Sequence, residues 1–261
     1  MTLKEILIAG KLTISEGGGG GGGISIDDLA LNLAPSGDIV LGSGVTEIKD
    51  HAFQGKPITS VKGESVTKIG IHALNDTQIT SITDADFPSL GVGTRYDVVL
   101  RLPTTCKSIK LSGPKIALAS GSYALRECKG LQTAEFPNAA YDVGVSFNSI
   151  GTYAFYSCTE LTMADCGYVQ SIAANAFGNC SKFGTLILRS PTRVTLSHES
   201  AFNGTKFKSG GAGGTIYIPK VLYDHLGDGS DMDYKAAAKW SIVDGYGTII
   251  WAKIEGSPYE L

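Results

Sequence analysis

Cysteine is the residue type whose positions in this chain most invite a chemical explanation. The five cysteines are Cys106, Cys128, Cys158, Cys166 and Cys180. Thiols can form disulfides, bind metals or act as nucleophiles, and each use needs a suitable partner or spacing. No CxxC pair and no Cys/His spacing of a zinc site occurs. An odd number of cysteines, behind an N-terminus that does not match a secretory signal, also argues against a disulfide framework. We therefore expect the cysteines to be reduced.

The other chemistry-bearing side chains form no catalytic pattern. His51 and His72 each precede an alanine in a similar turn, whereas His198 and His225 are isolated. No GxSxG elbow, HExxH motif, P-loop or dinucleotide fingerprint is present. The acidic loop at 224–233 lacks the ligand spacing and the closing glutamate of an EF-hand. The sequence thus predicts no enzyme, no cofactor and no metal site.

Composition narrows the choice of partners. The chain has 261 residues and a net charge of −3, without a basic cluster that would bind nucleic acid or an anionic membrane. Its longest apolar runs are of strand length, well below the ~20 residues that a membrane-spanning helix needs. We therefore expect neither nucleic-acid binding nor membrane insertion.

A repeat provides the elements that position these residues. IGTYAFYSC at 150–158 returns as IAANAFGNC at 172–180, and spacings of this size indicate a stacked-repeat architecture. An alanine followed by phenylalanine or leucine marks each unit, at Ala52, Ala73, Ala124, Ala154, Ala176 and Ala201. The interval from Ala73 to Ala124 is about two ordinary periods, and its segment 106–113 resembles the strand of a degenerate unit. The helix-like turn at each alanine is followed by a segment of alternating polarity, which predicts a strand with one buried face.

The repeat also explains the cysteines. The position four residues after each marker alanine holds Lys56, Thr77, Cys128, Cys158, Cys180 and Thr205. A column of small, half-polar side chains inside a solenoid is the simpler interpretation, because cysteine packs there as a compact hydrophobe. The alternative is a redox or metal ladder, since neighbouring coils lie only ~4.8 Å apart.

The unit I-x-x-x-A-F-x-x-C-x-x-L resembles the leucine-rich repeat of the BspA-like class, known from bacterial surface and phage proteins. The resemblance covers about Gly44 to Pro219, and it is weakest in the insertion around Asp84–Pro103. It implies an α/β-type repeat solenoid with one parallel strand per coil, which serves as a scaffold for binding surfaces.

Three parts of the chain are predicted on this basis. Residues 1–43 form an N-terminal arm with a glycine run at Gly17–Gly23, residues 44–219 form the solenoid, and residues 220–261 form a C-terminal cap. The cap is expected to contain a helix that begins at a capping box, Ser230 to Asp233, and a final strand. Apolar segments in the arm are expected to pair with other copies of the chain, giving a homo-oligomer. Such an arm is similar to those of phage virion proteins.

The solenoid sheet is the candidate binding surface. In each strand, one residue between the last two apolar positions should point outward, giving the column Lys62, Thr83, Lys110, Glu135, Asp165, Ile187 and Tyr217. Glu135, Asp165, Ile187 and Tyr217, with Met163 beside them, are the predicted ligand-binding residues. The alternative is an ordinary solvated sheet face. The predicted function is a non-enzymatic binding or structural protein of a phage virion that recognises a protein or a surface glycan. A bacterial cell-surface adhesin is the alternative, and an enzyme acting on carbohydrate ranks last.

Overall fold

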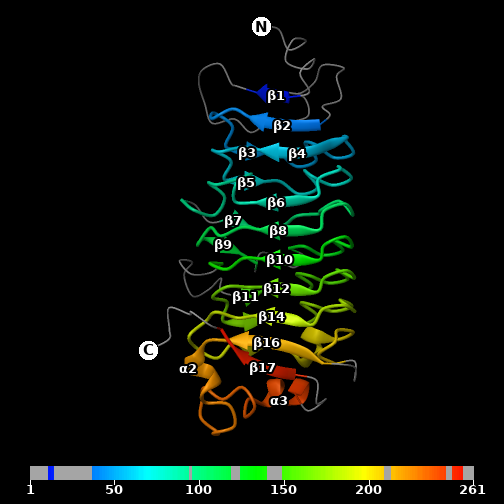
Figure 1. Cartoon of the computed structure of the whole chain (residues 1–261). Coiled ribbons are helices and arrows are strands. Elements are labelled where there is room, and N and C mark those ends of the chain that lie inside the picture. Colours follow the sequence, from blue (N-terminus) through cyan, green and yellow to red (C-terminus); the bar gives the residue numbers. More distant parts are fainter. Residues whose placement is uncertain are drawn as a thin grey trace.

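The chain forms an elongated ladder of stacked coils, closed at its C-terminal end by a helical cap (Figure 1). The computed structural model describes residues 11–14, 37–93, 96–118, 124–139, 149–208, 213–244 and 249–254. The glycine run at Gly17–Gly23 and the apolar segment at 24–33 lie outside these residues.

One face of the ladder is a seven-stranded parallel sheet. Its strands are β6 (Ser81–Thr83), β8 (Ser108–Lys110), β10 (Thr133–Glu135), β12 (Met163–Asp165), β14 (Thr185–Ile187), β16 (Gly214–Ile218) and β17 (Ile249–Lys253). We call it the main sheet. The middle residue of each short strand is buried, as the alternating pattern predicts. Strand β8 lies in the segment expected to be the strand of the degenerate unit.

The main sheet takes one parallel strand from each of its coils, as expected, but the coils also carry a second short strand that the sequence did not predict. These strands form parallel ladders β3–β5, β7–β9 and β11–β13–β15. Their bounds are β3 (Glu47–Ile48), β5 (Lys68–Ile69), β7 (Tyr96–Asp97), β9 (Ile116–Ala117), β11 (Ser149–Ile150), β13 (Ser171–Ile172) and β15 (Thr195–Leu196). We call this set the second strand column. It contains the isoleucine that lies four residues before four of the six marker alanines, namely Ile48, Ile69, Ile150 and Ile172.

The fold is mostly strand, which corrects the α/β-type expectation. The marker alanines lie in turns, except that Ala201 lies in a short 3-10 helix, η2 (Glu199–Phe202). Two residues of the repeating turn adopt positive φ, as at Tyr153 and Ser157 (φ 59° and 58°) and at Asn175 and Asn179 (φ 53° and 60°). A left-handed residue interrupts α-helical geometry, so each alanine turn closes without becoming a helix.

Backbone hydrogen bonds between the turns link successive coils. Phe155 N–H donates to the Ala176 carbonyl at 2.7 Å, and Phe177 N–H donates to the Ala201 carbonyl at 2.9 Å. Leu100 N–H donates in the same way to the Ala124 carbonyl at 2.7 Å. Leu100 therefore takes the place of the phenylalanine, and β7 and β8 complete an extra coil around it. The insertion at 84–103 thus contains part of a repeat unit that the sequence motif does not reveal.

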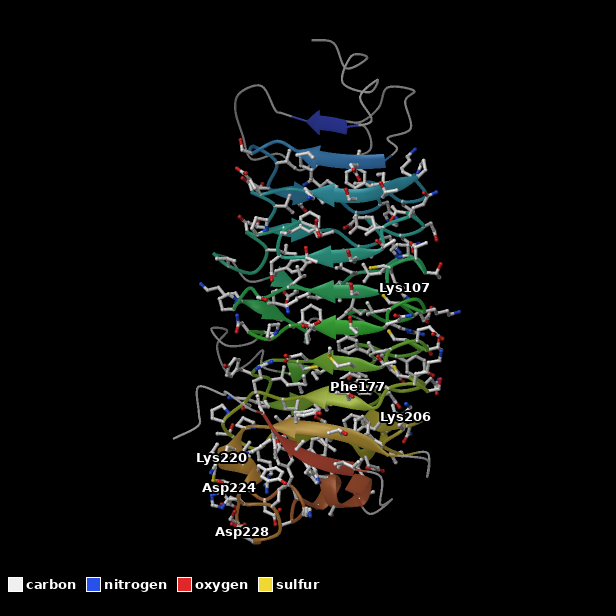
Figure 2. The ribbon with its side chains drawn as sticks, in the orientation of Figure 1. Lys107, Phe177, Lys206, Lys220, Asp224 and Asp228 are labelled. Atoms are coloured by element: carbon white, nitrogen blue, oxygen red, sulfur yellow. The ribbon has the colours of Figure 1, made fainter. Side chains whose placement is uncertain are left out.

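The core is a continuous stack between the two strand columns. Phe177 lies in its interior, between Phe155 and Phe202, with ring centroids 5.0 and 5.6 Å away and nearly parallel planes (Figure 2). All five cysteines are free and buried. Cys180 donates to the Phe155 carbonyl at 2.9 Å, and Cys158 donates to the Leu125 carbonyl at 3.0 Å. These thiols therefore act as small core side chains that bond to the coil before them.

The C-terminal cap covers the open end of this core. It contains α2 (Lys220–Tyr223) and α3 (Ala238–Asp244), and its last described strand is β17. Trp240 Nε1–H donates to the Val194 carbonyl at 2.6 Å, and Val194 N–H donates to the Tyr234 hydroxyl at 2.9 Å. The helix expected from the Ser230–Asp233 capping box begins later, at Ala238, because residues 231–237 form turns.

The strand ladder begins N-terminal to residue 44. Strands β1 (Lys11–Ile14) and β2 (Gly37–Leu41) belong to a three-stranded parallel sheet with β4 (Ile58–Lys62). Lys11–Ile14 pair residue by residue with Asp38–Leu41 of the same chain. This part of the predicted arm therefore extends the stack of the first coil.

Candidate functional site

The outward face of the main sheet carries two columns of side chains in register. Residues of β6, β8, β10, β12, β14, β16 and β17 pair one to one along the sheet. One column is the predicted one, and it runs Thr83, Lys110, Glu135, Asp165, Ile187, Tyr217 and Ala252. The other runs Ser81, Ser108, Thr133, Met163, Thr185, Thr215 and Ile250. Lys62, the first residue of the predicted column, lies on β4 and therefore belongs to the three-stranded sheet of β1, β2 and β4.

In the polar half of the predicted column, the charges of Lys110 and Glu135 neutralise each other. Glu135 forms an ion pair with Lys110 of the neighbouring strand at 3.1 Å, and both side chains remain solvated. A surface pair of this kind contributes little to stability because water screens both charges. Both side chains therefore remain accessible to a binding partner.

Asp165, in contrast, is not available for a ligand. Its side chain is only 4% exposed, and the Arg189 guanidinium bonds to both carboxylate oxygens at 2.6 to 3.1 Å. Gly167 N–H donates a further hydrogen bond to Oδ1 at 3.1 Å. The Asp165 carboxylate raises the pKa of Arg189 above its ordinary value. The sequence analysis did not predict this ion pair. The feature that could have indicated it is the basic residue Arg189, which follows shortly after β14.

The apolar half of the face is partly exposed. Met163, Ile187 and Tyr217 are half-buried on three successive strands, and Ile250 on β17 is 58% exposed. Only Thr185 and Thr215 separate Met163 from Ile250 along their column. We call Met163, Ile187, Tyr217 and Ile250 the apolar patch. Apolar side chains gathered on an exposed face are a typical feature of protein-binding surfaces.

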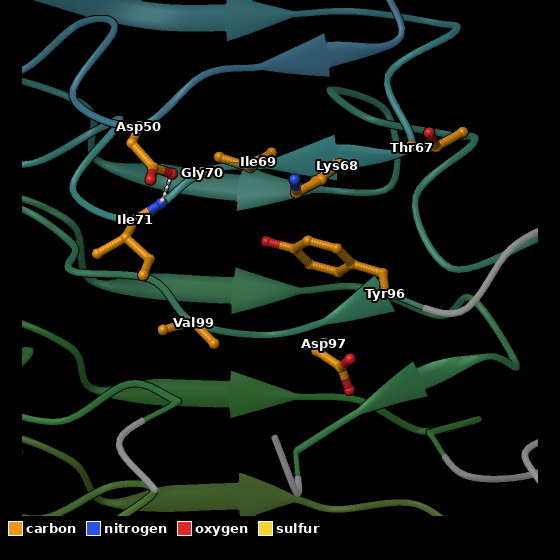
Figure 3. Close-up of a pocket in the computed structure, with 9 residues that line it drawn as sticks. All are labelled: Asp50, Thr67, Lys68, Ile69, Gly70, Ile71, Tyr96, Asp97 and Val99. Carbon is orange, nitrogen blue, oxygen red and sulfur yellow. Dashed lines mark hydrogen bonds between the residues drawn. The ribbon is translucent and has the colours of Figure 1, made fainter. Parts of the chain in front are cut away.

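The structure also contains a pocket that the sequence did not predict. It measures about 450 Å³ and lies between β5 and β7 in the second strand column (Figure 3). Within the described chain, no strand pairing joins β5 to β7, so the column is interrupted there. Asp50, Lys68, Ile71, Tyr96 and Asp97 are among the residues that line the pocket. The departure of residues 84–103 from the repeat was the sequence feature that could have indicated it.

The stacked histidines form a structural ladder near this pocket. His51 and His72 have positive φ, and their rings stack at 5.1 Å. Burial, followed by the charges of His51 and Arg101, lowers the pKa of His72. His51 binds Gln54 through Nδ1 at 2.6 Å. As expected from the sequence, both histidines are turn residues.

The described residues contain no group that could hold a metal ion. No cluster of three or more metal-ligating side chains occurs among them. In the acidic loop of the cap, Asp233 accepts from the N–H groups of Gly229 and Lys235, and Asp228 accepts from that of Ser230. These carboxylates therefore stabilise the loop itself.

The repeat geometry agrees with a known family. A model of the BspA type leucine rich repeat region, in six copies, matches residues 25–144 and 103–215, which together make up most of the chain. The chain belongs to the BspA-type leucine-rich repeat family. Proteins built from such repeats are generally non-enzymatic binding proteins. The family match also includes residues 25–43, which the sequence analysis assigned to the arm.

Two solved structures are similar to this BspA-type chain. A leucine-rich repeat protein from Bacteroides ovatus has 20% identity and a TM-score of 0.46, over 83% of this chain and 54% of that protein. A leucine rich cell surface protein from Faecalibacterium prausnitzii has 18% identity and a TM-score of 0.32, over 64% of this chain and 50% of that protein. The chain thus spans about half the length of both relatives. A comparison with curated protein sequences found no match.

Proposed function

We propose that this BspA-type protein binds a protein partner through the outward face of its main sheet. The observation that supports the proposal is the apolar patch, whose four residues lie on four neighbouring strands in the two outward columns. Its four side chains are held on a rigid, hydrogen-bonded sheet, so binding would require little ordering of the protein. The adjacent Lys110–Glu135 pair provides a polar margin, as at many interfaces with an apolar centre.

Recognition of a protein fits this surface better than recognition of a glycan. Ile187, Tyr217 and Met163 are half-buried side chains on the outward face of a sheet, whereas small ligands are usually enclosed in a cleft or cavity. Tyrosine and methionine are enriched at protein interfaces, where they bury large apolar areas. The finer proposal is therefore an adhesin-like protein–protein contact.

The bacterial cell surface is the proposed location. Of the two locations that the sequence suggested, the phage virion has no support among the similar proteins. In the described residues, no helix has the length and apolar character to cross a bilayer. Self-assembly through residues 1–43 stays a prediction, although β1 and β2 already pair within one chain.

A binding screen with matched surface variants tests the proposal. Purified protein would be applied to arrays of surface and matrix proteins and of glycans, and the hits measured by biolayer interferometry. We expect protein hits that weaken by about tenfold or more in Ile187→Glu and Tyr217→Glu, because a charge would enter the apolar centre. Ile242→Glu is the control, since Ile242 is 48% exposed on α3, outside the patch. Hits that survive both patch variants, or hits confined to glycans, would contradict the proposal.

A further inference from the structure

The pocket between β5 and β7 contains a buried polar group without a partner. Tyr96 is only 3% exposed, and its hydroxyl has no hydrogen-bond partner among the described residues. Figure 3 shows the ring extending from β7 into the pocket, with the hydroxyl directed toward Gly70 and Ile71. A buried hydroxyl left without a hydrogen bond destabilises the folded state, so its retention calls for an explanation.

The charged groups of the pocket define what could satisfy this hydroxyl. Asp50 and Asp97 provide two carboxylates, and Lys68 provides one ammonium group. The Lys68 ammonium already pairs with Glu47 at 2.7 Å and is 64% exposed at the rim. Glu47 also pairs with Lys49 at 2.7 Å, so it is shared between two ammonium groups. In the lining of the pocket itself, the two carboxylates outnumber the one ammonium group.

Asp50 is placed to act as an acceptor. Its Oδ1 accepts the Ile71 N–H at 2.7 Å, which fixes the orientation of the carboxylate. This close approach depends on Gly70, because a Cβ at that position would lie 2.3 Å from Asp50 Oδ1. Within the described chain, the second oxygen, Oδ2, has no hydrogen-bond partner. Asp50 Oδ2 and the Tyr96 hydroxyl oxygen are therefore two acceptors in the lining of one pocket.

The remaining walls are apolar. Ile69 is buried, Val99 is half-buried, and Ile71 is 43% exposed at the margin of the pocket. Such walls suit an aliphatic stem, while the acceptors suit a head that carries several N–H donors. A volume of about 450 Å³ accommodates a group of this size.

We propose that this pocket binds an organic cation, namely an ammonium or guanidinium group on a short apolar stem. Its N–H groups would donate to Asp50 Oδ2 and to the Tyr96 hydroxyl oxygen, and its charge would complement Asp50. The cation could be a lysine or arginine side chain of a peptide, or a free amine. This site lies in the second strand column and does not depend on the apolar patch.

The test uses the full chain and defined probes. Nα-acetyl-arginine methylamide represents a peptide side chain, agmatine represents a free amine, and Nα-acetyl-citrulline methylamide is the uncharged isostere. Binding would be followed by titration calorimetry and by NMR shifts of the residues that line the pocket. We expect saturable binding of a cationic probe with a Kd of about 1 mM or tighter, and binding at least about tenfold weaker for the citrulline probe. The stronger of the two cationic probes identifies the source of the cation.

Conservative variants assign the binding to this pocket. Tyr96→Phe removes only the hydroxyl, and Asp50→Asn removes the charge but keeps an oxygen acceptor for Ile71. Each variant should weaken binding by about tenfold. Tyr223→Phe and Asp231→Asn make the same chemical changes in the C-terminal cap and should leave the affinity within about twofold.

Thermal melts keep this test independent of folding. Without a probe, Tyr96→Phe should melt at the native temperature or above it, because it removes an unsatisfied buried hydroxyl. Equal affinity for the citrulline probe, unchanged binding by Tyr96→Phe and Asp50→Asn, or no saturable binding up to about 20 mM would each overturn the proposal.

Discussion

The environment of a single residue in this solenoid is set largely by the neighbouring coil. The cysteine column shows this clearly, because each thiol in it bonds to a carbonyl of the preceding coil. Burial, which is the largest cause in each case, raises the pKa of Cys158 and Cys166 well above the ordinary value and that of Cys106 to about 12. The structure supports the packing interpretation over the redox ladder, because all five cysteines are free and buried.

Thiol reactivity tests this assignment. The native protein at about pH 8 should react very slowly with a disulfide reagent, because all five thiols are buried and the raised pKa of Cys158 and Cys166 further limits thiolate formation. In denaturant without reductant, all five cysteines should react. Three or fewer reactive thiols would contradict the assignment.

The Asp165–Arg189 pair gives a second residue-scale prediction. Arg189→Met would leave a carboxylate that is 4% exposed with only the Gly167 N–H as a donor. We expect a loss of about 3 kcal/mol in the free energy of unfolding, measured by denaturant titration. Lys182→Met is the control, because the Lys182–Glu160 pair is solvated and should contribute no more than about 0.5 kcal/mol. Equal effects of the two changes would show that Asp165 finds another partner.

At the scale of the element, the recurring unit is a turn with two left-handed residues. Ser157 has φ of 58°, and its side chain is half-buried. Ser157→Gly should be neutral or stabilising by up to about 1 kcal/mol, because glycine adopts this conformation without strain. Ser157→Val should destabilise by about 2 kcal/mol, because a β-branched residue is poorly tolerated at positive φ. Denaturation midpoints would show the difference, and equal midpoints would contradict the turn geometry.

The sequence predicted those elements whose residues repeat and missed those that depend on a neighbouring coil. The alanine turns and the main sheet follow from local patterns, namely an Ala-Phe pair and a buried middle residue in each strand. The second strand column is made of two-residue strands such as β5 and β13, which are too short to show alternation. The coil around Leu100 was hidden because Leu100 replaces phenylalanine, and its hydrogen bond to Ala124 appears only in three dimensions.

The sequence predicted which residues of the candidate surface lie side by side on neighbouring strands. It did not predict which of their side chains are free to contact a ligand. The paired residues from Thr83 to Tyr217 form the expected column. Periodicity places Asp165 on the outer face, yet Arg189, which follows the neighbouring strand, encloses it. The pocket could not be predicted, because it arises where the β5 and β7 ladders fail to join.

For the whole molecule, stability depends on how the two ends of the stack are closed. Each coil contacts mainly its neighbours, so an uncovered end frays and exposes core residues. At the C-terminal end, Trp240 is 1% exposed and contacts the rings of Phe202, Tyr234 and Trp251. At the N-terminal end, β2 places Ile39 and Leu41, 0% and 4% exposed, over the first coil.

Truncation at the N-terminal end separates a closing strand from an assembly arm. A chain of residues 37–261 keeps β2, whereas a chain of residues 44–261 loses it and leaves the β4 edge and the first coil uncovered. We expect the shorter chain to melt at a lower temperature and to associate, because an exposed strand edge next to apolar side chains invites pairing between molecules. Light scattering and thermal melts on both chains and on the full-length protein would measure this.

The same measurements decide the self-assembly prediction. If residues 1–36 join copies of the chain, the full-length protein should be larger than the 37–261 chain in solution, and the difference should persist on dilution to the concentrations used for melts. If these residues only extend the stack, as the pairing of β1 with β2 indicates for Lys11–Ile14, the two should be the same size. A 44–261 chain that stays monomeric and as stable as the full-length protein would show that the first coil needs no strand above it. The boundary at residue 44 would then be the true start of the folding unit.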